Sequence, residues 1–238
     1  MRDHLICNHC HLKRFCLPSE LKKTELGLFE KIVSRPPALE TGQHLHNRGD
    51  RFRSIYIVRT GSLKCSIPAQ FDHAEQITGI YLPGEFVGMT GVGAGLYQCT
   101  ALALEPTSVC GFPFEELLRL ADQITSLGKR FIQIMGEKIC LDHEIMAVLG
   151  KPMADRRIAA LLVSFSSRLK RLGWAEDDIH LGLGRRSIGE YLGLSERTIN
   201  RVLATFERQG LVQTERHRVL IRNLPELQTI AGQLTLSD

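Results

Sequence analysis

Three cysteines near the N-terminus have the spacing of metal ligands. Cys7, Cys10 and Cys16 follow the pattern C-x2-C-x5-C. Two thiolates separated by two residues can bind one metal ion, or two corners of an iron–sulfur cluster, and a third can close a loop around it. The residues before Pro18 have no helical or strand period, so we expect them to be held in place by what they bind. Three nearby histidines could also be ligands, which leaves zinc open: His4, His9 and His11.

The remaining cysteines are less distinctive. Cys65 and Cys99 lie in predicted strands, where a cysteine is most often a small buried hydrophobe. Cys110 ends a predicted strand just before a helix. The chain has no apolar run of membrane-spanning length and no signal-peptide core at its start, so we expect a cytoplasmic protein without a membrane partner. Its seven cysteines are then thiols or metal ligands rather than disulfides.

A second chemically informative stretch runs from Arg186 to Gly210. Its apolar period predicts two helices joined by a tight turn at Gly193, with Ser195 as the N-cap of the second helix. One face of that helix is apolar: Ile199, Val202, Leu203 and Phe206. These features have the spacing of a helix-turn-helix motif.

The opposite face of the second helix carries Arg197, Asn200 and Arg201, which are side chains that read base edges in a DNA major groove. The alternative is a helical hairpin with a solvated basic face. Charge favours double-stranded DNA as the partner, because the whole formal excess of +4 falls within residues 151–238.

The residues after the motif predict a wing. Residues 211–214 and 218–221 have the pattern of two short strands around a polar turn, and Arg216 and Arg218 can contact phosphates. The candidate DNA-contacting residues are Ser195, Arg197, Thr198, Asn200, Arg201, Arg216 and Arg218.

The elements that must position these two sites precede the motif. A helical stretch follows Pro18, and its apolar residues share one face up to Arg35. Residues 38–113 contain short apolar runs bounded by Gly, Pro and Asp, which predict an antiparallel barrel or jelly roll. The clearest predicted strands are residues 54–58, 61–67, 76–82 and 97–104.

A long helix is predicted from about Phe114 to Leu149, with a break near Asp122. Its apolar seam consists of Ile124, Phe131, Met135, Ile145 and Leu149. Asp142 shares this seam, seven residues after Met135 and seven before Leu149. In a symmetric coiled coil it faces its own copy, and the two like charges repel. The alternative is a carboxylate turned to solvent by a slightly rotated helix.

Lys151 and Pro152 end the long helix, and a further helix is predicted from Ala154 to Leu172. The predicted fold class is therefore α+β, with an N-terminal β-barrel, a long dimerisation helix and a C-terminal winged helix-turn-helix. The predicted parts are residues 1–17, which bind the metal or cluster, the barrel at 18–121, the long helix at 122–150, and the DNA-binding domain at 151–238.

This order of elements resembles the cyclic-AMP receptor protein superfamily, and most closely its oxygen-sensing branch, the fumarate-nitrate reductase regulators. The resemblance covers nearly the whole chain. The motifs that carry the resemblance are Cys7, Cys10 and Cys16 with the distant Cys110, residues 75–79 (EQITG), residues 82–88 (LPGEFVG) and residues 188–194 (IGEYLGL). The resemblance implies a [4Fe–4S] cluster on Cys7, Cys10, Cys16 and Cys110. It leaves Cys65, Cys99 and Cys140 without a counterpart, and we expect them to be structural.

The resemblance also implies a homodimeric transcriptional activator that binds an inverted-repeat operator and RNA polymerase. On the same basis, we expect oxygen to dismantle the cluster and repulsion at Asp142 then to separate the dimer. A cyclic nucleotide is not the expected ligand, because residues 95–99 (GLYQC) stand where that branch has a phosphate-binding Arg-Ser pair. At the position of the family's base-reading Glu this chain has Arg197, so we expect an altered operator.

The alternatives are a regulator with a structural zinc and an enzyme. A structural zinc or another small-ligand input at the same cysteines would give a regulator that does not sense oxygen. An enzyme is not indicated, because the sequence has no Gly-rich phosphate loop, nucleophile elbow or recognisable carboxylate pair.

Overall fold

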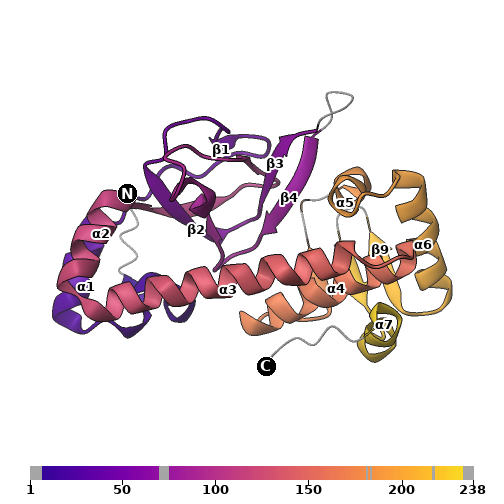
Figure 1. The fold of residues 1–238 in the computed structure, drawn as a ribbon. Helices are drawn as coiled ribbons and strands as arrows, with labels where there is room; N and C mark the ends of the chain where they lie inside the picture. The colour runs from indigo at the N-terminus through magenta and orange to yellow at the C-terminus, as the bar shows by residue number, and fades with distance from the viewer. Residues whose placement is uncertain (1–6, 70–74, 181, 183, 216–217, 233–238) are drawn as a thin grey trace. The chain divides into compact units, whose positions relative to one another are not determined.

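The computed structural model describes residues 7–69, 75–180, 182, 184–215 and 218–232. The chain divides into two compact units. The first comprises residues 1–67 and 79–139, and the second comprises residues 68–78 and 140–238. The division falls inside α3 (Thr125–Leu149), which Figure 1 shows as one long helix. Among the residues described, no helix is long and apolar enough to cross a membrane.

Two antiparallel sheets form the barrel (Figure 1). Their orders are β1-β6-β3-β4 and β5-β2-β7. The strands are β1 (His44–His46), β2 (Ser54–Thr60), β3 (Leu63–Pro68), β4 (Glu75–Tyr81), β5 (Phe86–Val87), β6 (Thr100–Ala103) and β7 (Ser108–Pro113). The predicted strands at 54–58, 61–67 and 76–82 are confirmed to within a few residues, and the predicted run at 97–104 contains β6.

Small and branched side chains from both sheets fill the barrel interior. Val58 of β2, Leu63 of β3 and Ala101 of β6 are completely buried there, because alternate residues of each strand face inward. Cys65 and Cys99 belong to the same cluster, as expected for small apolar side chains.

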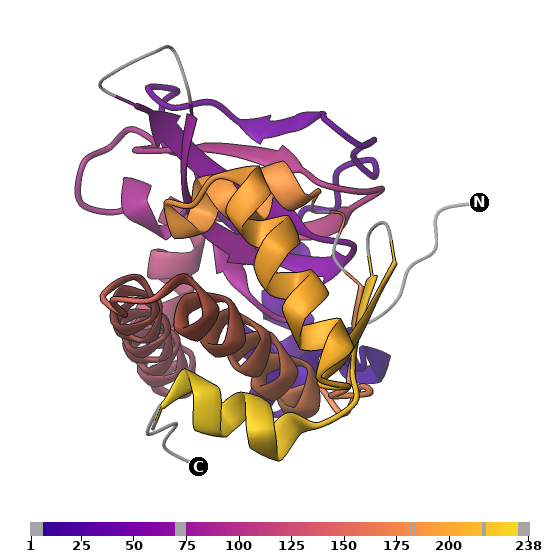
Figure 2. The same cartoon turned by 90° about the vertical axis from the view of Figure 1, so that its right-hand side faces the viewer.

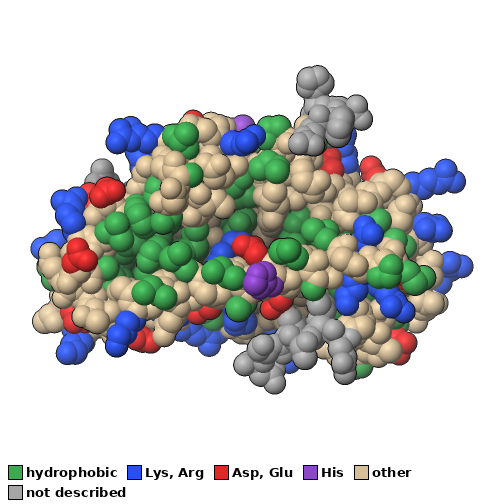
Figure 3. Space-filling view, viewed as in Figure 1, with side chains coloured by type: hydrophobic (Ala, Val, Ile, Leu, Met, Phe, Trp, Pro, Cys, Tyr) green, Lys and Arg blue, Asp and Glu red, His purple; other side chains and the backbone are tan. Residues whose placement is uncertain are grey.

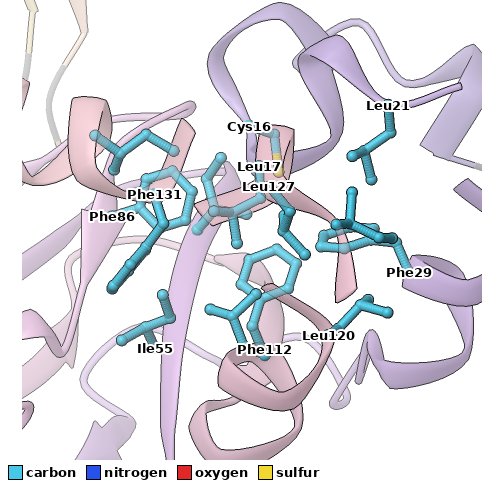
Figure 4. Close-up of a cluster of buried hydrophobic side chains, with 14 of the residues drawn as sticks. Cys16, Leu17, Leu21, Phe29, Ile55, Phe86, Phe112, Leu120, Leu127 and Phe131 are labelled. Atoms are coloured by element: carbon cyan, nitrogen blue, oxygen red, sulfur yellow. The ribbon is translucent and has the colours of Figure 1, made fainter. Parts of the chain in front are cut away.

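A second apolar cluster holds the N-terminal segment to the first unit (Figure 4). That segment forms three short 3-10 turns, η1 (Cys7–His9), η2 (Lys13–Phe15) and η3 (Leu17–Glu20). Leu17 packs with Phe29 of α1 (Lys23–Ile32) and Phe112 of β7, and each is at most 1% exposed. Leu12 is also buried. Burying such a side chain contributes about 1.5–3 kcal/mol, so the segment has its own apolar anchors, which the sequence pattern did not predict.

The predicted break between helices is confirmed at Ile124, between α2 (Phe114–Gln123) and α3. The predicted seam needs correction, because Ile124, Phe131 and Ile145 are buried within the chain and Ile124 precedes α3. Phe131 packs near Phe114, with ring centroids 6.1 Å apart. The exposed apolar residues of α3 instead form a stripe in which Ile132 and Met146 replace Phe131 and Ile145: Ile132, Met135, Ile139, Met146 and Leu149. Figure 3 shows hydrophobic side chains along this helix.

The second unit contains the predicted winged motif (Figure 2). Its helices are α4 (Ala154–Arg171), α5 (Arg185–Leu192), α6 (Glu196–Arg208) and α7 (Leu224–Ala231). Its sheet has the order β8-β10-β9, with β8 (Asp178–His180), β9 (Val212–Glu215) and β10 (Arg218–Ile221). β8 and α7 were not predicted. β8 is the third strand of the wing sheet, and α7 packs against α4.

Candidate cysteine site and nucleic-acid interface

The three N-terminal cysteines lie on consecutive tight turns. The Cys10 amide donates to the Cys7 carbonyl at 3.3 Å, and the Cys16 amide donates to the Lys13 carbonyl at 3.1 Å. The Cys7 amide donates to Glu30 Oε1 of α1 at 2.7 Å, which ties the start of the site to the helix below it. Cys16 is buried, whereas Cys7 and Cys10 are half-buried.

Cys110 reaches the same site from β7, where it pairs with Ile57 of β2. Neighbouring cysteines raise the pKa of Cys7, Cys16 and Cys110 through their charge, and Cys10 contributes to the effect on all three. Cys110 therefore lies at the same apolar cluster as Cys7 and Cys16, although it is more than ninety residues from them in the chain.

Arg35 is a member of this site that the sequence did not reveal. Its Nη2 lies 3.7 Å from Cys7 Sγ, and its guanidinium also hydrogen-bonds the Cys110 thiol. Burial raises the pKa of Cys7 and of Cys110, and the positive charge of Arg35 opposes this rise. Nothing in the local pattern marks Arg35, because it precedes two prolines in a loop.

The donor set fits an iron–sulfur cluster. Within the described part of the chain, no group of three or more Cys, His, Asp or Glu converges as the ligands of one metal ion do. A [4Fe–4S] cluster would be held by four cysteine thiolates, which Cys7, Cys10, Cys16 and Cys110 could supply, and when bound it would provide redox chemistry. Burial raises the pKa of Cys16 well above its usual value, and neighbouring cysteines raise it further. A thiol of this kind loses its proton when a metal centre binds the sulfur, because the positive charge of the metal stabilises the thiolate.

The turn and the N-cap that precede α6, the predicted DNA-recognition helix, fix where this helix begins. Gly193 has φ 65° at the turn, and Ser195 Oγ accepts a hydrogen bond from the Thr198 amide at 3.2 Å. Gly189 permits the close approach of α5 to the turn, because a Cβ there would lie 2.5 Å from the Leu194 carbonyl oxygen. The predicted turn and N-cap are confirmed, and the predicted apolar face of α6 is buried.

The predicted base-reading side chains are available. Arg197, Asn200 and Arg201 are exposed on α6, and among the residues described no hydrogen bond or ion pair engages their side chains. Ser195 and Thr198 differ from them, since their hydroxyl oxygens lie 2.9 Å apart and complete the cap. They position the start of the helix.

The two predicted phosphate-contacting residues of the wing, Arg216 and Arg218, have different outcomes. Arg218 makes a two-pronged ion pair with Asp178 of β8, with Nε–Oδ1 and Nη2–Oδ2 distances of 2.7 Å each. This pair neutralises Arg218, which makes it a weaker candidate for a phosphate contact than the sequence indicated. Arg216 lies outside the described residues. Thr214 of β9 ties the wing to the motif, because its hydroxyl and amide donate to Glu207 of α6 at 2.7 Å, and Arg185 of α5 donates to the same hydroxyl at 2.9 Å.

An antiparallel barrel, a long helix and a helix-turn-helix with unengaged Arg and Asn side chains define a DNA-binding regulator. Family models agree. Residues 37–124 match the cyclic nucleotide-binding domain, and residues 156–230 match the Crp-like helix-turn-helix domain.

The chain belongs to the family of fumarate and nitrate reduction regulators and Anr activators, which confirms the resemblance. It is 38% identical over 226 residues to the transcriptional activator protein anr of Pseudomonas aeruginosa, covering 95% of this chain and 92% of the relative. It is 34% identical over 227 residues to the fumarate and nitrate reduction regulatory protein of Escherichia coli, covering 95% and 90%. The protein is thus a DNA-binding transcription regulator.

Solved structures confirm the fold. FixK2 from Bradyrhizobium japonicum superposes with a TM-score of 0.75 at 22% sequence identity, covering 85% of this chain and 98% of that one. A CooA mutant from Carboxydothermus hydrogenoformans superposes with a TM-score of 0.67 at 16% identity, covering 90% and 92%.

Proposed function

We propose that this regulator senses oxygen through a [4Fe–4S] cluster held by Cys7, Cys10, Cys16 and Cys110, and that it activates transcription as a homodimer. The observation that supports the proposal is that Cys7, Cys16 and Cys110, from two distant segments, pack on one apolar cluster, and Arg35 lies beside two of these thiols. The charges of Cys7, Cys10 and Cys110 also act on Cys16. When bound, the cluster would supply reactivity toward oxygen.

Packing and hydrogen bonds connect the cysteine site to α3. Cys16 belongs to the apolar cluster that includes Phe29 and Phe112 and extends to Phe131 of α3 (Figure 4). Arg130 of α3 donates to the Phe15 carbonyl at 3.2 Å and to Glu137 at 2.7 Å. A change in the N-terminal turns therefore acts directly on the first half of α3.

The exposed stripe of α3 supports homodimerisation. Ile132, Met135, Ile139, Met146 and Leu149 repeat with alternating spacings of three, four or seven residues, as the a and d positions of a coiled coil do. Asp142 is exposed and completes the series, three residues after Ile139 and four before Met146. A second copy of the stripe is the natural cover for such an apolar surface. Asp142 is then the residue that makes this dimer conditional.

The DNA-reading residues support an inverted-repeat operator. A symmetric dimer presents α6 twice, and each copy reads one half-site. Arg201 is suited to a guanine, through O6 and N7. Arg197 cannot accept a hydrogen bond from cytosine as a Glu does, so we propose an operator altered at that base pair. RNA polymerase is the proposed protein partner, consistent with the relatives' description as transcriptional activators.

A cyclic nucleotide is not part of the proposal. Cys99 is buried in the barrel, next to where a nucleotide-binding relative would have its phosphate-binding arginine. A thiol there cannot neutralise a buried phosphate.

Iron and sulfide analysis of protein purified without air tests the proposal. Cys7, Cys10, Cys16 and Cys110 are each changed to Ser, with Cys140→Ser as the matched control on an exposed thiol. We expect each of the four variants to lose iron, visible absorption and anaerobic DNA binding, and the control to keep all three. Full iron content in Cys110→Ser would contradict the ligand assignment, and zinc in place of iron would favour a structural clip.

A further inference from the structure

The backbone fixes Arg35 next to Cys110. Ser34, the residue before Arg35, forms an antiparallel bridge with Gly111 of β7, in which each amide donates to the other residue's carbonyl at 2.8 Å. In this register the next opposed pair is Arg35 and Cys110, whose side chains leave the same face. Gly111 permits the bridge, because a Cβ there would overlap Ser34 Oγ. The place of Arg35 therefore does not depend on its own side chain.

The guanidinium of Arg35 also reaches Cys7. Its Nη2 donates to Cys7 Sγ at 3.7 Å, and the Cys7 amide donates to Glu30 Oε1 at 2.7 Å. Cys7 is thus held at its backbone by α1 and at its sulfur by Arg35. Pro36 and Pro37 follow Arg35, and their fixed φ limits the freedom of the loop. One side chain therefore contacts two predicted ligands that come from distant segments of the chain.

The charges around these two sulfurs come from several elements. At Cys7 the positive charge of Arg35 is opposed by the carboxylate of Glu30, whereas at Cys110 Arg59 of β2 adds a second positive charge. Arg35 acts on both cysteines. It is half-buried, so its charge is screened less than that of a surface arginine. A guanidinium also keeps its charge throughout the physiological pH range.

We propose that Arg35 is a positioning residue that acts through Cys7 and Cys110 and makes the cluster they bind harder to oxidise. This role rests on the proposed [4Fe–4S] function. Net charge and hydrogen bonds to the sulfurs set the reduction potential of such a group. Oxidation removes an electron, which oxygen accepts, and so leaves less negative charge for the guanidinium to attract. Arg35 therefore favours the reduced state and slows the response to oxygen.

Three variants separate the charge of Arg35 from its shape. Arg35→Gln keeps an N–H donor and removes the charge, Arg35→Lys keeps the charge, and Arg48→Gln is the matched control. Arg48 is exposed, and its amide donates to Thr100 of β6, in the sheet that does not contain Cys110. Each full-length protein is purified and loaded with iron and sulfide without air.

Redox titration without air and the decay of visible absorption in air are the two readouts. We expect Arg35→Gln to have a lower reduction potential than the parent and to lose its visible absorption several-fold faster. Arg35→Lys should stay close to the parent, and Arg48→Gln should equal it. Thermal unfolding of the cluster-free proteins should be the same for all, because the Ser34–Gly111 bridge holds the loop without the Arg35 side chain.

An unchanged potential and decay rate in Arg35→Gln would overturn the proposal, as would equal changes in Arg35→Gln and Arg35→Lys. If Arg35→Gln alone retains no iron, the positive charge is what keeps the cluster bound, which supports the proposal. Loss of iron from both Arg35 variants would assign Arg35 to the shape of the loop and overturn it. None of these results alters the ligand test, in which full iron content in Cys110→Ser contradicts the proposed function.

Discussion

Arg201 is exposed on α6 and is placed to donate to a base edge. Arg201→Ala should relax the preference at one base pair of each half-site and cost about 1–3 kcal/mol in specific binding, because a bidentate contact to guanine is lost. Binding titrations on the operator and on a set of single-base variants measure this. Arg208→Ala is the control, since Arg208 lies at the end of α6 and donates to Thr205. A uniform loss across all sequences would assign Arg201 to a phosphate instead.

The base read by Arg197 can be identified without knowing the operator. Selection from random DNA should return a half-site that differs from the family's at the base pair that a Glu would read, because a guanidinium only donates hydrogen bonds. Arg197→Glu should restore the family half-site. Recovery of the family half-site by the unaltered protein would show that Arg197 does not reach a base.

The Asp178–Arg218 pair makes wing stability depend on pH. The hydrogen bonds and charge of Arg218 lower the pKa of Asp178 below its ordinary value of 3.8. A carboxylate with a depressed pKa stabilises the fold above its unfolded pKa, and this contribution is lost as the pH falls through its folded pKa. Urea unfolding should therefore find the parent more stable than Asp178→Asn at pH 6, with the difference shrinking as the pH falls below the ordinary pKa of 3.8. A difference independent of pH would assign the effect to packing.

At the scale of the elements, Arg157 of α4 joins two helix ends. Its Nε donates to the Lys151 carbonyl at 2.7 Å, just beyond α3, and its Nη1 donates to the Leu192 carbonyl at 3.2 Å, at the end of α5. Both carbonyls lie at the negative ends of helix dipoles, where a cation is favoured.

Arg157→Met should lower the free energy of unfolding by about 1–3 kcal/mol, since two carbonyls lose a charged donor. It should also weaken DNA binding, because α5 loses its link to α4. Arg156→Met is the matched control, because Arg156 is the exposed neighbour of the same charge, and it should change stability by no more than about 0.5 kcal/mol. Arg157→Lys should restore part of the loss. Equal effects of both Met variants would show that only net charge matters.

The elements that could be predicted from the sequence are those with local signals. Gly193 and Ser195 predict the turn and the N-cap of the helix-turn-helix motif. The break between α2 and α3 lies at Ile124, within two residues of its predicted place. The predicted seam of α3 contains Phe131 and Ile145, whereas the exposed stripe contains Ile132 and Met146. A helical period identifies an apolar face, but it does not show which part of a wide apolar face is buried by the rest of the chain. α7 was missed, although Asn223 caps it through the Glu226 amide at 3.1 Å.

At the scale of the whole molecule, the cysteine site could be predicted only in part. The spacing of Cys7, Cys10 and Cys16 indicates ligands by itself, whereas Cys110 was assigned from a family resemblance. Arg35 gave no signal, because its contact with Cys7 and Cys110 depends on how α1 leads into the barrel. The ion pair of Arg218 gave no signal for a related reason: its partner Asp178 lies forty residues away, in a strand that the sequence did not show.

Asp142 decides whether the proposed dimer needs its cluster. Two copies of this carboxylate face each other when the stripes of two chains pair, and like charges about 4 Å apart repel by about 4 kcal/mol at an effective dielectric of about 20. This is comparable with the net stability of a short coiled coil, so a small change at the start of α3 can shift the balance. Asp142→Ala removes the repulsion and adds a better helix former. The variant should dimerise and bind DNA in air, without iron.

Sedimentation of cluster-free proteins measures this directly. Asp142→Asn should dimerise as Asp142→Ala does, because it also removes the charge, whereas Asp142→Glu keeps the charge and should stay monomeric. Met135→Glu in the Asp142→Ala background should return the protein to monomer, since Met135 belongs to the same exposed stripe. Equal monomer fractions in Asp142→Ala and the parent would place Asp142 outside the interface, and the residues that make dimerisation conditional would then lie elsewhere on α3.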